Sequence, residues 1–316
     1  FVHIPWPGPD AWRILPDAIR SAILTSLLAS DRVGFQTRRD AFNFVQCCRF
    51  YIPDAHSRGS RDAIHYQGRK IEARAYPISI DVEKMESLVE EPPTHLLKSQ
   101  LINVVGDRKL ILRVDRVEPS KNILRGLEAY RALLAAHPEH RGRVQMLALL
   151  VPSRMEVGEY QDYLQQIMAQ AGMINAEFSE EYWEPVRIML GENYARAIAA
   201  LQLYDVLLVN PIADGMNLVA KEGALVNRRD GVLILSESAG AHAELGEHAL
   251  VVSPFDIHST AEAMHQALTI PPDERQRRAV ALRKSVQGAG VKLWFQNQLD
   301  DALRAWSSQD KNDSTS

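Results

Sequence analysis

From about residue 107 onward, short apolar segments alternate with segments of helical periodicity. The expected strands are Lys109–Val114, Val144–Val151, Val206–Asn210, Gly231–Ser236 and Ala249–Ser253. The expected helices between them include Ile123–Ala136, Val157–Ala171, Tyr194–Gln202 and Thr260–Ala267. Short buried strands that alternate with helices predict a parallel α/β sheet with right-handed crossovers. Ligands of such sheets bind beyond the carboxyl ends of the strands, so polar residues that directly follow a strand are the first candidates for a site.

Residues 1–98 have a less regular pattern and are expected to form part of a separate domain. Segments 17–28 and 38–48 have the periodicity of amphipathic helices. Segment 63–76 reads as a hairpin that turns at Gly68. Two prolines in segment 90–94 place a domain boundary near residue 98, and the polar residues 307–316 predict a disordered tail.

The composition is that of an ordinary globular protein, with 46% hydrophobic and 24% charged residues and a formal net charge of −4 over 316 residues. This charge does not indicate a nucleic-acid partner. No apolar run approaches the roughly 20 residues of a membrane-spanning helix, so no membrane partner is expected. Cys47 and Cys48 are adjacent and have no metal-ligand spacing, which favours free thiols and a cytoplasmic protein.

Two cations, Arg116 and Lys121, follow the expected strand 109–114 in a turn that contains proline. A guanidinium and an ammonium in this position suit phosphate oxygens. The alternative is a solvated pair that forms salt bridges with neighbours such as Asp115 or Glu118.

The segment Asp214–Glu222 (DGMNLVAKE) follows the expected strand 206–210 and opens a helix. A helix N-terminus after a strand and a turn binds anions through its backbone N–H groups and the helix dipole. The alternative for Asp214 is a simple N-cap. Lys221 is left without a role.

Three further side chains have competing interpretations. His3 lies in an apolar, proline-rich segment, where a histidine is more often structural. Arg154 follows the expected strand 144–151 and is either a phosphate ligand or a surface residue at the start of a helix. His242 and Glu244 suggest an acid–base pair, but a solvated helix is the favoured interpretation.

Seven motifs in the same order resemble those of the trehalose-6-phosphate synthase family, retaining glycosyltransferases of the two-domain GT-B fold (glycosyltransferase family 20). The motifs are found at residues 1–7 (FVHIPWP), 33–37 (VGFQT), 76–81 (YPISID), 116–122 (RVEPSKN), 152–154 (PSR), 214–222 (DGMNLVAKE) and 236–241 (SESAGA), and the resemblance as a whole covers the chain from His3 to about Trp306. The resemblance implies a complete C-terminal Rossmann-like donor domain at 99–290, preceded by the C-terminal part of an N-terminal domain at 1–98. It also implies that helix 291–306 packs on the N-terminal domain, and that the chain lacks most of that domain.

The resemblance assigns roles to the candidate residues. Arg116 and Lys121 correspond to the family's diphosphate clamp, and Glu222 corresponds to the residue that binds the ribose hydroxyls. The donor sugar would be contacted by Asp214 and by the backbone of Gly215, Met216, Asn217 and Leu218.

Two roles fall outside the donor loops. By resemblance, His3 hydrogen-bonds the donor sugar across the cleft, and Arg154 contacts the phosphate of the acceptor. The base-binding pocket is expected around Glu192–Ile198. Pro119 and Asn122 stand where the family commonly has Tyr and Gly. The charged residues of this loop are retained, so we expect a difference in the shape of the loop and not in its role.

The implied activity is that of a retaining hexosyltransferase. Glucose would pass from a UDP-, GDP- or ADP-glucose donor to glucose 6-phosphate, giving α,α-trehalose 6-phosphate without a cofactor or a metal. A first alternative is a relative with another acceptor, of the glucosylglycerol-phosphate or validoxylamine-phosphate synthase type; the segment Phe1–Asp10 also resembles the latter. A second is a non-catalytic sugar-phosphate-binding regulator. The base and any homo-oligomer stay open.

Overall fold

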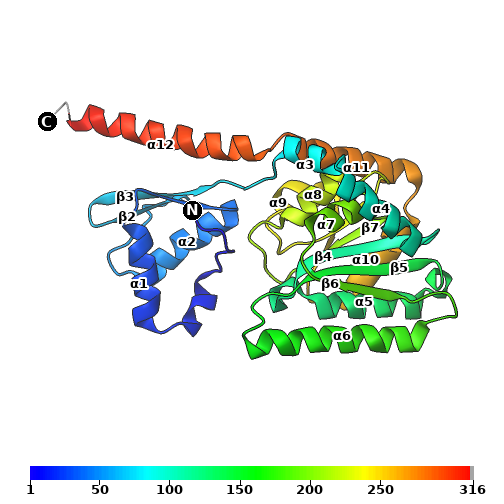
Figure 1. Cartoon of the computed structure of the whole chain (residues 1–316). Helices are drawn as coiled ribbons and strands as arrows, with labels where there is room; N and C mark the ends of the chain where they lie inside the picture. Colours follow the sequence, from blue (N-terminus) through cyan, green and yellow to red (C-terminus); the bar gives the residue numbers. More distant parts are fainter. Residues whose placement is uncertain (314–316) are drawn as a thin grey trace. The chain divides into compact units, whose positions relative to one another are not determined.

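The computed structural model describes the backbone of residues 1–313 and the side chains of residues 1–306. The chain forms two compact units (Figure 1). The first contains Phe1–Ile78 together with helix α12 (Val291–Asp313), and the second contains Ser79–Gly290. Each unit has its own hydrophobic core.

The boundary between the units lies at residues 78–79, whereas the sequence placed it near residue 98. Helices α3 (Val82–Val89) and α4 (Pro92–Val105) account for this difference, because both contact helices of the second unit. The two prolines of segment 90–94 therefore do not mark a linker. Pro92 occupies the first turn of α4, where a proline costs no hydrogen bond and its fixed φ suits the helix.

The second unit is built on a six-stranded sheet in which every pair of neighbours is parallel. In spatial order its strands are β6 (Val186–Leu190), β5 (Val144–Val151), β4 (Lys109–Arg116), β7 (Val206–Val209), β8 (Val232–Ser236) and β9 (Leu250–Val252). Counted within the unit, this order is 3-2-1-4-5-6, the Rossmann arrangement, and it confirms the predicted parallel α/β sheet. Strand β6 was not identified from the sequence; it is a five-residue edge strand that is only partly buried and contains Arg187 among its apolar residues.

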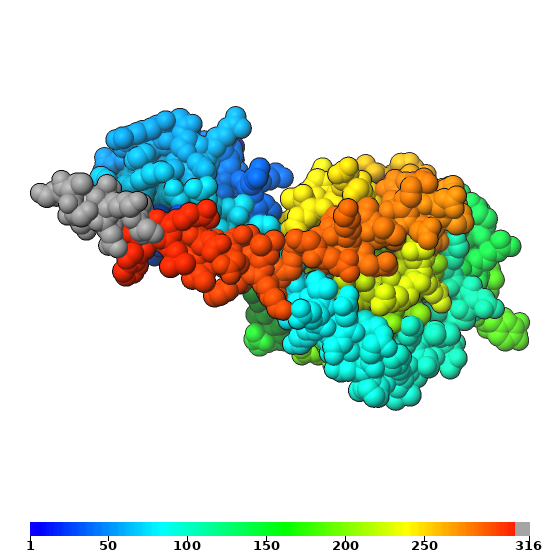
Figure 2. Space-filling model, turned by 90° about the horizontal axis from the view of Figure 1, so that it is seen from above, coloured from blue at the N-terminus to red at the C-terminus, as the bar shows by residue number. Residues whose placement is uncertain are grey.

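Helices cover both faces of this sheet (Figure 1). One face is covered by α5 (Ile123–Ala136), α6 (Gly158–Phe178) and α10 (Ile257–Thr269). The other is covered by α4, α7 (Tyr194–Leu201), α8 (Leu218–Val226) and α11 (Pro272–Gln287). Figure 2 shows α4 in cyan and α11 in orange on the outer surface of this unit. The sheet is therefore buried on both sides, which explains its continuous apolar strands.

The first unit has a three-stranded sheet in the order β1 (Arg32–Phe35), β3 (Arg69–Ala75) and β2 (Ala63–Tyr66). The predicted hairpin is confirmed: β2 and β3 are antiparallel, and Gly68 has a φ of 77° in the turn between them. Helix α2 (Arg38–Tyr51) packs against this sheet, and α1 (Asp17–Leu28) packs against α2. Cys47 and Cys48 lie in α2 as buried free thiols.

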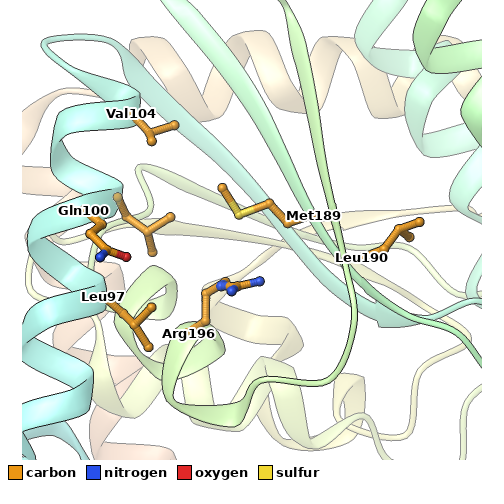
Figure 3. A pocket seen from close by; sticks show the side chains of 7 residues that line it. Leu97, Gln100, Val104, Met189, Leu190 and Arg196 are labelled. Carbon is orange, nitrogen blue, oxygen red and sulfur yellow. The ribbon is translucent and has the colours of Figure 1, made fainter.

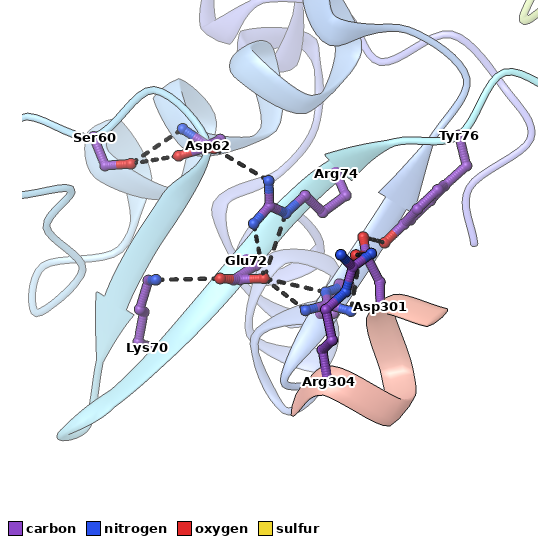
Figure 4. Close-up of polar contacts among 9 residues, drawn as sticks. Ser60, Asp62, Lys70, Glu72, Arg74, Tyr76, Asp301 and Arg304 are labelled. Atoms are coloured by element: carbon purple, nitrogen blue, oxygen red, sulfur yellow. Dashed lines mark hydrogen bonds and ion pairs between the residues drawn. The ribbon is translucent and has the colours of Figure 1, made fainter. Parts of the chain in front are cut away.

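Helix α12 contacts the first unit through polar side chains (Figure 4). The Tyr76 hydroxyl donates a hydrogen bond to Asp301 Oδ2 at 2.8 Å, and Trp294 Nε1 donates to the Tyr76 carbonyl at 3.0 Å.

Glu72 of β3 lies among basic side chains in the same region (Figure 4). Burial raises the pKa of Glu72, but hydrogen bonds from Arg32 and Lys70 outweigh this effect and bring the pKa to about 2.

The end of α12 corrects the expectation of a disordered tail from residue 307. The backbone is helical as far as Asp313, and residues 307–313 contain no proline or glycine to end the helix. Residues 314–316 lie outside the described part of the chain. Within the described part, no helix combines the length and apolar character needed to cross a bilayer.

Candidate functional site

The strand order of the large sheet reverses between β4 and β7, which are parallel neighbours. The loop that follows β4 contains Lys121, and the loop that follows β7 contains Asp214. Both loops therefore lie at the carboxyl edge of the sheet, at the switch point where ligands of Rossmann-like sheets bind. The backbone joins them, since Ile212 N donates to the Ser120 carbonyl at 2.8 Å.

Lys121 and Asp214, which are 93 residues apart in the sequence, form an ion pair at this switch point. Lys121 Nζ lies 2.5 Å from Asp214 Oδ2, and the two side chains are only 12% and 16% exposed. Asn217 Nδ2 donates to the same carboxylate oxygen at 3.0 Å. Three residues predicted for the site are thus in direct contact.

The β4 loop rests on a buried arginine that the sequence did not single out. Arg113 is fully buried and donates to Asp115 Oδ2 at 2.9 Å, to the Lys121 carbonyl at 2.9 Å and to Asn210 Oδ1 at 3.0 Å. Gly126 leaves space for it, because a Cβ at that position would lie 2.2 Å from the guanidinium. One indication of this role was visible in the sequence, which is that Arg113 is a charged residue inside the apolar segment 109–114.

Asn122 explains how the β4 loop keeps its shape without the glycine that is common in related sequences. Its φ of 59° and ψ of 39° are left-handed, a conformation that asparagine tolerates better than most residues. Its Nδ2 donates to the carbonyls of Asn210 at 3.0 Å and Pro254 at 2.7 Å. These bonds tie the β4 loop to the segments that follow β7 and β9.

Helix α8 begins at the second loop, and its N-cap is Asn217 rather than Asp214. Asn217 is left-handed, with a φ of 73°, and its Oδ1 accepts a hydrogen bond from Ala220 N at 3.1 Å. The alternative that Asp214 is the N-cap is therefore wrong, because its carboxylate faces Lys121 instead. The backbone of Gly215 to Leu218 forms the approach to the positive end of α8.

Gly240 lets a third loop approach the second one closely. Gly240 N donates to the Asp214 carbonyl at 3.0 Å, and Ala241 N donates to the Met216 carbonyl at 2.7 Å. A Cβ on Gly240 would lie 1.9 Å from the Gly215 carbonyl oxygen. A glycine is therefore needed at this position for the close backbone contact.

Lys221 points away from the switch point into the protein. Its side chain is fully buried, and its Nζ lies 2.9 and 3.0 Å from the two carboxylate oxygens of Glu244. Burial lowers the pKa of Lys221, and Glu244 partly offsets this effect. The favoured interpretation of Glu244 as part of a solvated helix is wrong, because its carboxylate neutralises a buried ammonium.

Glu222 is positioned by Tyr194, a residue that the sequence did not single out. The Tyr194 hydroxyl donates to Glu222 Oε1 at 3.0 Å and also lies 3.1 Å from Met85 Sδ. Burial raises the pKa of Glu222, and the hydrogen bond from Tyr194 lowers it in part. The hydrogen bond from Tyr194 thus orients this carboxylate in the second turn of α8.

The remaining predicted residues are less enclosed. Arg116 is 58% exposed, and its Nη1 lies 2.7 Å from Glu118 Oε1, as the surface-pair interpretation expected. Arg154 has a φ of 50° and donates to the Tyr160 hydroxyl at 3.0 Å. His3 lies in the first unit, with its ring 4.8 Å from that of Phe1. The roles assigned to these three by resemblance stay predictions.

A separate cavity of about 400 Å³ lies between α4 and the end of β6 (Figure 3). It is lined by Leu97, Gln100, Leu101, Val104, Met189, Leu190 and Arg196. Arg196 belongs to the range expected for the base pocket, but the rest of the lining is mostly apolar. Most of these residues come from α4, and of them only Leu97 falls in the segment 1–98 that the sequence assigned to the first domain.

Comparison with known proteins identifies the family. The sequence profile that describes glycosyltransferase family 20 matches residues 1–304 of this chain. The chain belongs to glycosyltransferase family 20. The trehalose-6-phosphate synthase of Sinorhizobium fredii is 36% identical over 305 residues, which cover 95% of this chain and 64% of that relative. The bifunctional trehalose-6-phosphate synthase/phosphatase of Thermoproteus tenax is 35% identical over 314 residues, or 98% of this chain and 42% of that relative.

Solved structures agree with the GT-B fold expected from the sequence. The α,α-trehalose-phosphate synthase (UDP-forming) from Burkholderia xenovorans, in complex with glucose-6-phosphate, has a TM-score of 0.88 at 31% identity. The alignment covers 95% of this family 20 chain and 67% of that protein.

A further relative by sequence is named for a different activity. A validamine 7-phosphate valienyltransferase of Streptomyces hygroscopicus subsp. jinggangensis is 32% identical over 300 residues, or 95% of this chain and 58% of that relative. The chain thus spans 42–64% of the length of these curated relatives.

Proposed function

We propose that the complete family 20 protein transfers glucose, with retention, from a nucleotide-glucose to glucose 6-phosphate, giving α,α-trehalose 6-phosphate. Residues 79–290 supply its donor half-site. The contact between Lys121 and Asp214 carries this proposal, because it brings a predicted phosphate-binding cation and a predicted sugar-binding carboxylate together at the switch point. The relatives named above support the choice of acceptor.

Charge at the donor loops supports catalysis by leaving-group stabilisation. Negative charge develops on the nucleoside diphosphate as the glycosidic bond breaks, and preorganised cations lower the free energy of that transition state. Arg116 and Lys121 provide these cations, and the N-terminus of α8 adds a partial positive charge. We propose that these groups act without a metal or cofactor at the donor site.

Both cations already have carboxylate partners, Glu118 for Arg116 and Asp214 for Lys121. A bound diphosphate would compete with these partners and would release Asp214 to accept hydrogen bonds from sugar hydroxyls. Glu222, which Tyr194 holds in place, would accept hydrogen bonds from the ribose. Arg154 is the proposed ligand of the acceptor phosphate, and His3 the proposed contact to the donor sugar.

The first test is calorimetric titration of the chain with UDP, GDP and ADP. One nucleotide should bind to the wild type, and the double variant Arg116→Ala/Lys121→Ala should lose this binding. Arg131→Ala is a matched control, because Arg131 forms ion pairs with Glu128 and Glu177 on the surface of the same unit. Equal affinity of the double variant and the wild type would contradict the donor site.

The second test separates the acceptors. The complete protein is incubated with the preferred nucleotide-glucose and glucose 6-phosphate, and the product is identified by mass. A valienyltransferase-type activity is the second candidate, favoured by the 32% identical relative. It predicts no product from glucose 6-phosphate and a product from an amino-cyclitol phosphate. Nucleotide binding without either product would favour the regulator.

A further inference from the structure

A second polar cluster lies in the same unit, at the opposite end of α5. Helix α5 ends at Ala136, and a 3-10 turn, η3 (Pro138–His140), follows it. Helix α10 packs against α5 and brings in further side chains. We call this group the histidine cluster; it consists of His137, Glu139 and His140 beside α5, and Glu262 and His265 on α10.

The potential ligand atoms of this cluster lie at distances that suit a small metal ion. Glu139 Oε1 lies 3.3 Å from His137 Nδ1 and 3.9 Å from His265 Nδ1. Ligand atoms of His137, Glu139 and His265 all lie within 4.8 Å of one another, and His140 Nε2 flanks this group at 3.0 Å from His265 Nδ1. In a tetrahedral zinc site with bonds of 2.0–2.1 Å, neighbouring ligand atoms are about 3.3 Å apart.

One member of the cluster is placed to orient a ligand. His137 Nε2 lies 3.3 Å from Glu262 Oε1, while Nδ1 of the same ring faces Glu139. A proton on Nε2 that is donated to Glu262 leaves the lone pair of Nδ1 free. Histidines that bind metals usually donate their other N–H to a carboxylate or carbonyl in this way.

The local charge also favours a cation. Glu139 and Glu262 bring two carboxylates to the cluster, each 3.3 Å from a nitrogen of His137. The C-terminal ends of α5 and α10 both lie here, and helix C-termini attract positive charge.

We propose that the histidine cluster binds one Zn²⁺ ion through one nitrogen each of His137 and His265 and one oxygen of Glu139, which leaves a fourth position for water. Imidazole nitrogens together with a carboxylate oxygen suit zinc better than the all-oxygen sites of magnesium or calcium. The rings of His137 and His265 are stacked with their centroids 3.7 Å apart, so the two rings must move slightly apart when one ion binds between their nitrogens and Glu139. Their side chains are 21% and 28% exposed, which leaves room for this adjustment.

The zinc ion would link the end of α5 to α10 and stabilise their packing. It would take no direct part in glycosyl transfer, because the 14 residues of α5 place the cluster about 20 Å from the donor loops. The site is therefore independent of the proposed function.

The test uses the full untagged chain, dialysed against a chelator and then titrated with Zn²⁺ by calorimetry. We expect one equivalent to bind to the wild type and the affinity to fall at least about tenfold in His265→Ala and in His137→Ala. His258→Ala is the matched control, because it removes an exposed histidine from the same helix and should leave the affinity unchanged. Glu262→Gln should bind more weakly than the wild type but more tightly than His137→Ala.

Two further measurements decide the outcome. Co²⁺ in place of Zn²⁺ should give the intense visible absorption of a tetrahedral site in the wild type and not in His265→Ala. Zn²⁺ should raise the Tm of the wild type and of His258→Ala, but not that of His265→Ala. A folded wild type that binds no Zn²⁺, or His265→Ala and His137→Ala variants that bind as tightly as the wild type, would overturn the proposal.

Discussion

The two ends of helix α5 carry polar clusters that suit ligands of opposite charge. At the N-terminal end, Lys121 and the backbone of the β4 loop lie at the switch point of the sheet. At the C-terminal end, the histidine cluster offers imidazole nitrogens and carboxylate oxygens. The helix dipole favours anions at the first end and cations at the second. One helix thus serves two sites because its ends differ electrostatically.

The two ends also differ in how their side chains are supported. The Lys121–Asp214 pair rests on the buried Arg113 and on two asparagines in left-handed conformations. The histidine cluster is partly exposed, and its rings contact one another directly. We therefore expect the donor end to be rigid and the metal end to adjust when it is occupied.

The largest expected effect comes from the loss of one positive charge at the N-terminal end of α5, which should leave the C-terminal end unaffected. Lys121→Ala should reduce the kcat of the complete protein roughly 10²–10³-fold, because one preorganised cation is lost from the leaving group. Zn²⁺ affinity should be unchanged, since the cluster lies at the other end of α5. Steady-state kinetics and zinc titration of the same preparation test both statements. A reduced affinity for Zn²⁺ would show that the two ends are not independent.

The next effect concerns the rigidity of the donor end. Gly240→Ala places a Cβ 1.9 Å from the Gly215 carbonyl oxygen and forces two loops apart. We expect a loss of at least about 1–3 kcal/mol in the free energy of unfolding, together with weaker nucleotide binding. Denaturant unfolding and calorimetry measure these changes. Gly8→Ala is the control, because nothing lies within 4 Å of its added Cβ; equal stability of the two variants would refute the tight contact.

A smaller effect is the pH dependence of nucleotide binding. Burial raises the pKa of Glu222 above its ordinary value of 4.5, so its carboxylate becomes neutral at a higher pH than an exposed glutamate. Affinity should fall as the pH decreases through this raised pKa. The cost in stability of burying the charged carboxylate should disappear over the same range.

Two variants test this dependence. Glu222→Gln should bind more weakly and lose the pH dependence, whereas Tyr194→Phe should move the profile to higher pH, because it removes the hydrogen bond that lowers the pKa. Calorimetry across a pH series compares them with the wild type. An unchanged profile in Glu222→Gln would exclude this carboxylate as the titrating group.

The smallest expected effect is communication between the two ends. Saturating Zn²⁺ should change the nucleotide Kd by less than the roughly fivefold that marks ordinary allosteric coupling. The reason is that buried residues hold α5 in place from Ile123 to Leu134, so binding at one end of the helix should not move the other end. Nucleotide titrations with and without Zn²⁺, in the wild type and in His265→Ala, measure the coupling. A larger change in the wild type alone would mean that α5 transmits binding energy.

Much of the second unit could be predicted from sequence periodicity. The strands from Lys109 to Val252 are continuous apolar runs because helices bury both faces of the sheet, and that pattern is visible without coordinates. The edge strand β6 was not identified, because it is short and Arg187 interrupts its apolar residues. The domain boundary was misplaced, because a proline at the start of a helix and a proline in a linker look alike in sequence.

The candidate site was predicted unevenly. Lys121 and Asp214 were expected from their positions after strands, and their contact follows from the strand order. Arg113 was not expected, because it lies inside a strand. Tyr194 falls within the range 192–198 expected for the base pocket, but its contact with Glu222, 28 residues away, was not expected. The histidine cluster escaped for the same reason: its members come from two helices that are 125 residues apart.

By itself, the sequence determined the α/β class, the order of the strands along the chain and the family, because periodicity and motifs are local properties. Tertiary structure alone decided which partners the charged groups take. Lys121 pairs with Asp214, Lys221 with Glu244 and His265 with His140 through contacts that span 23 to 125 residues. Such pairings depend on which strands and helices become neighbours, and burial then sets the electrostatic cost of every group left without a partner.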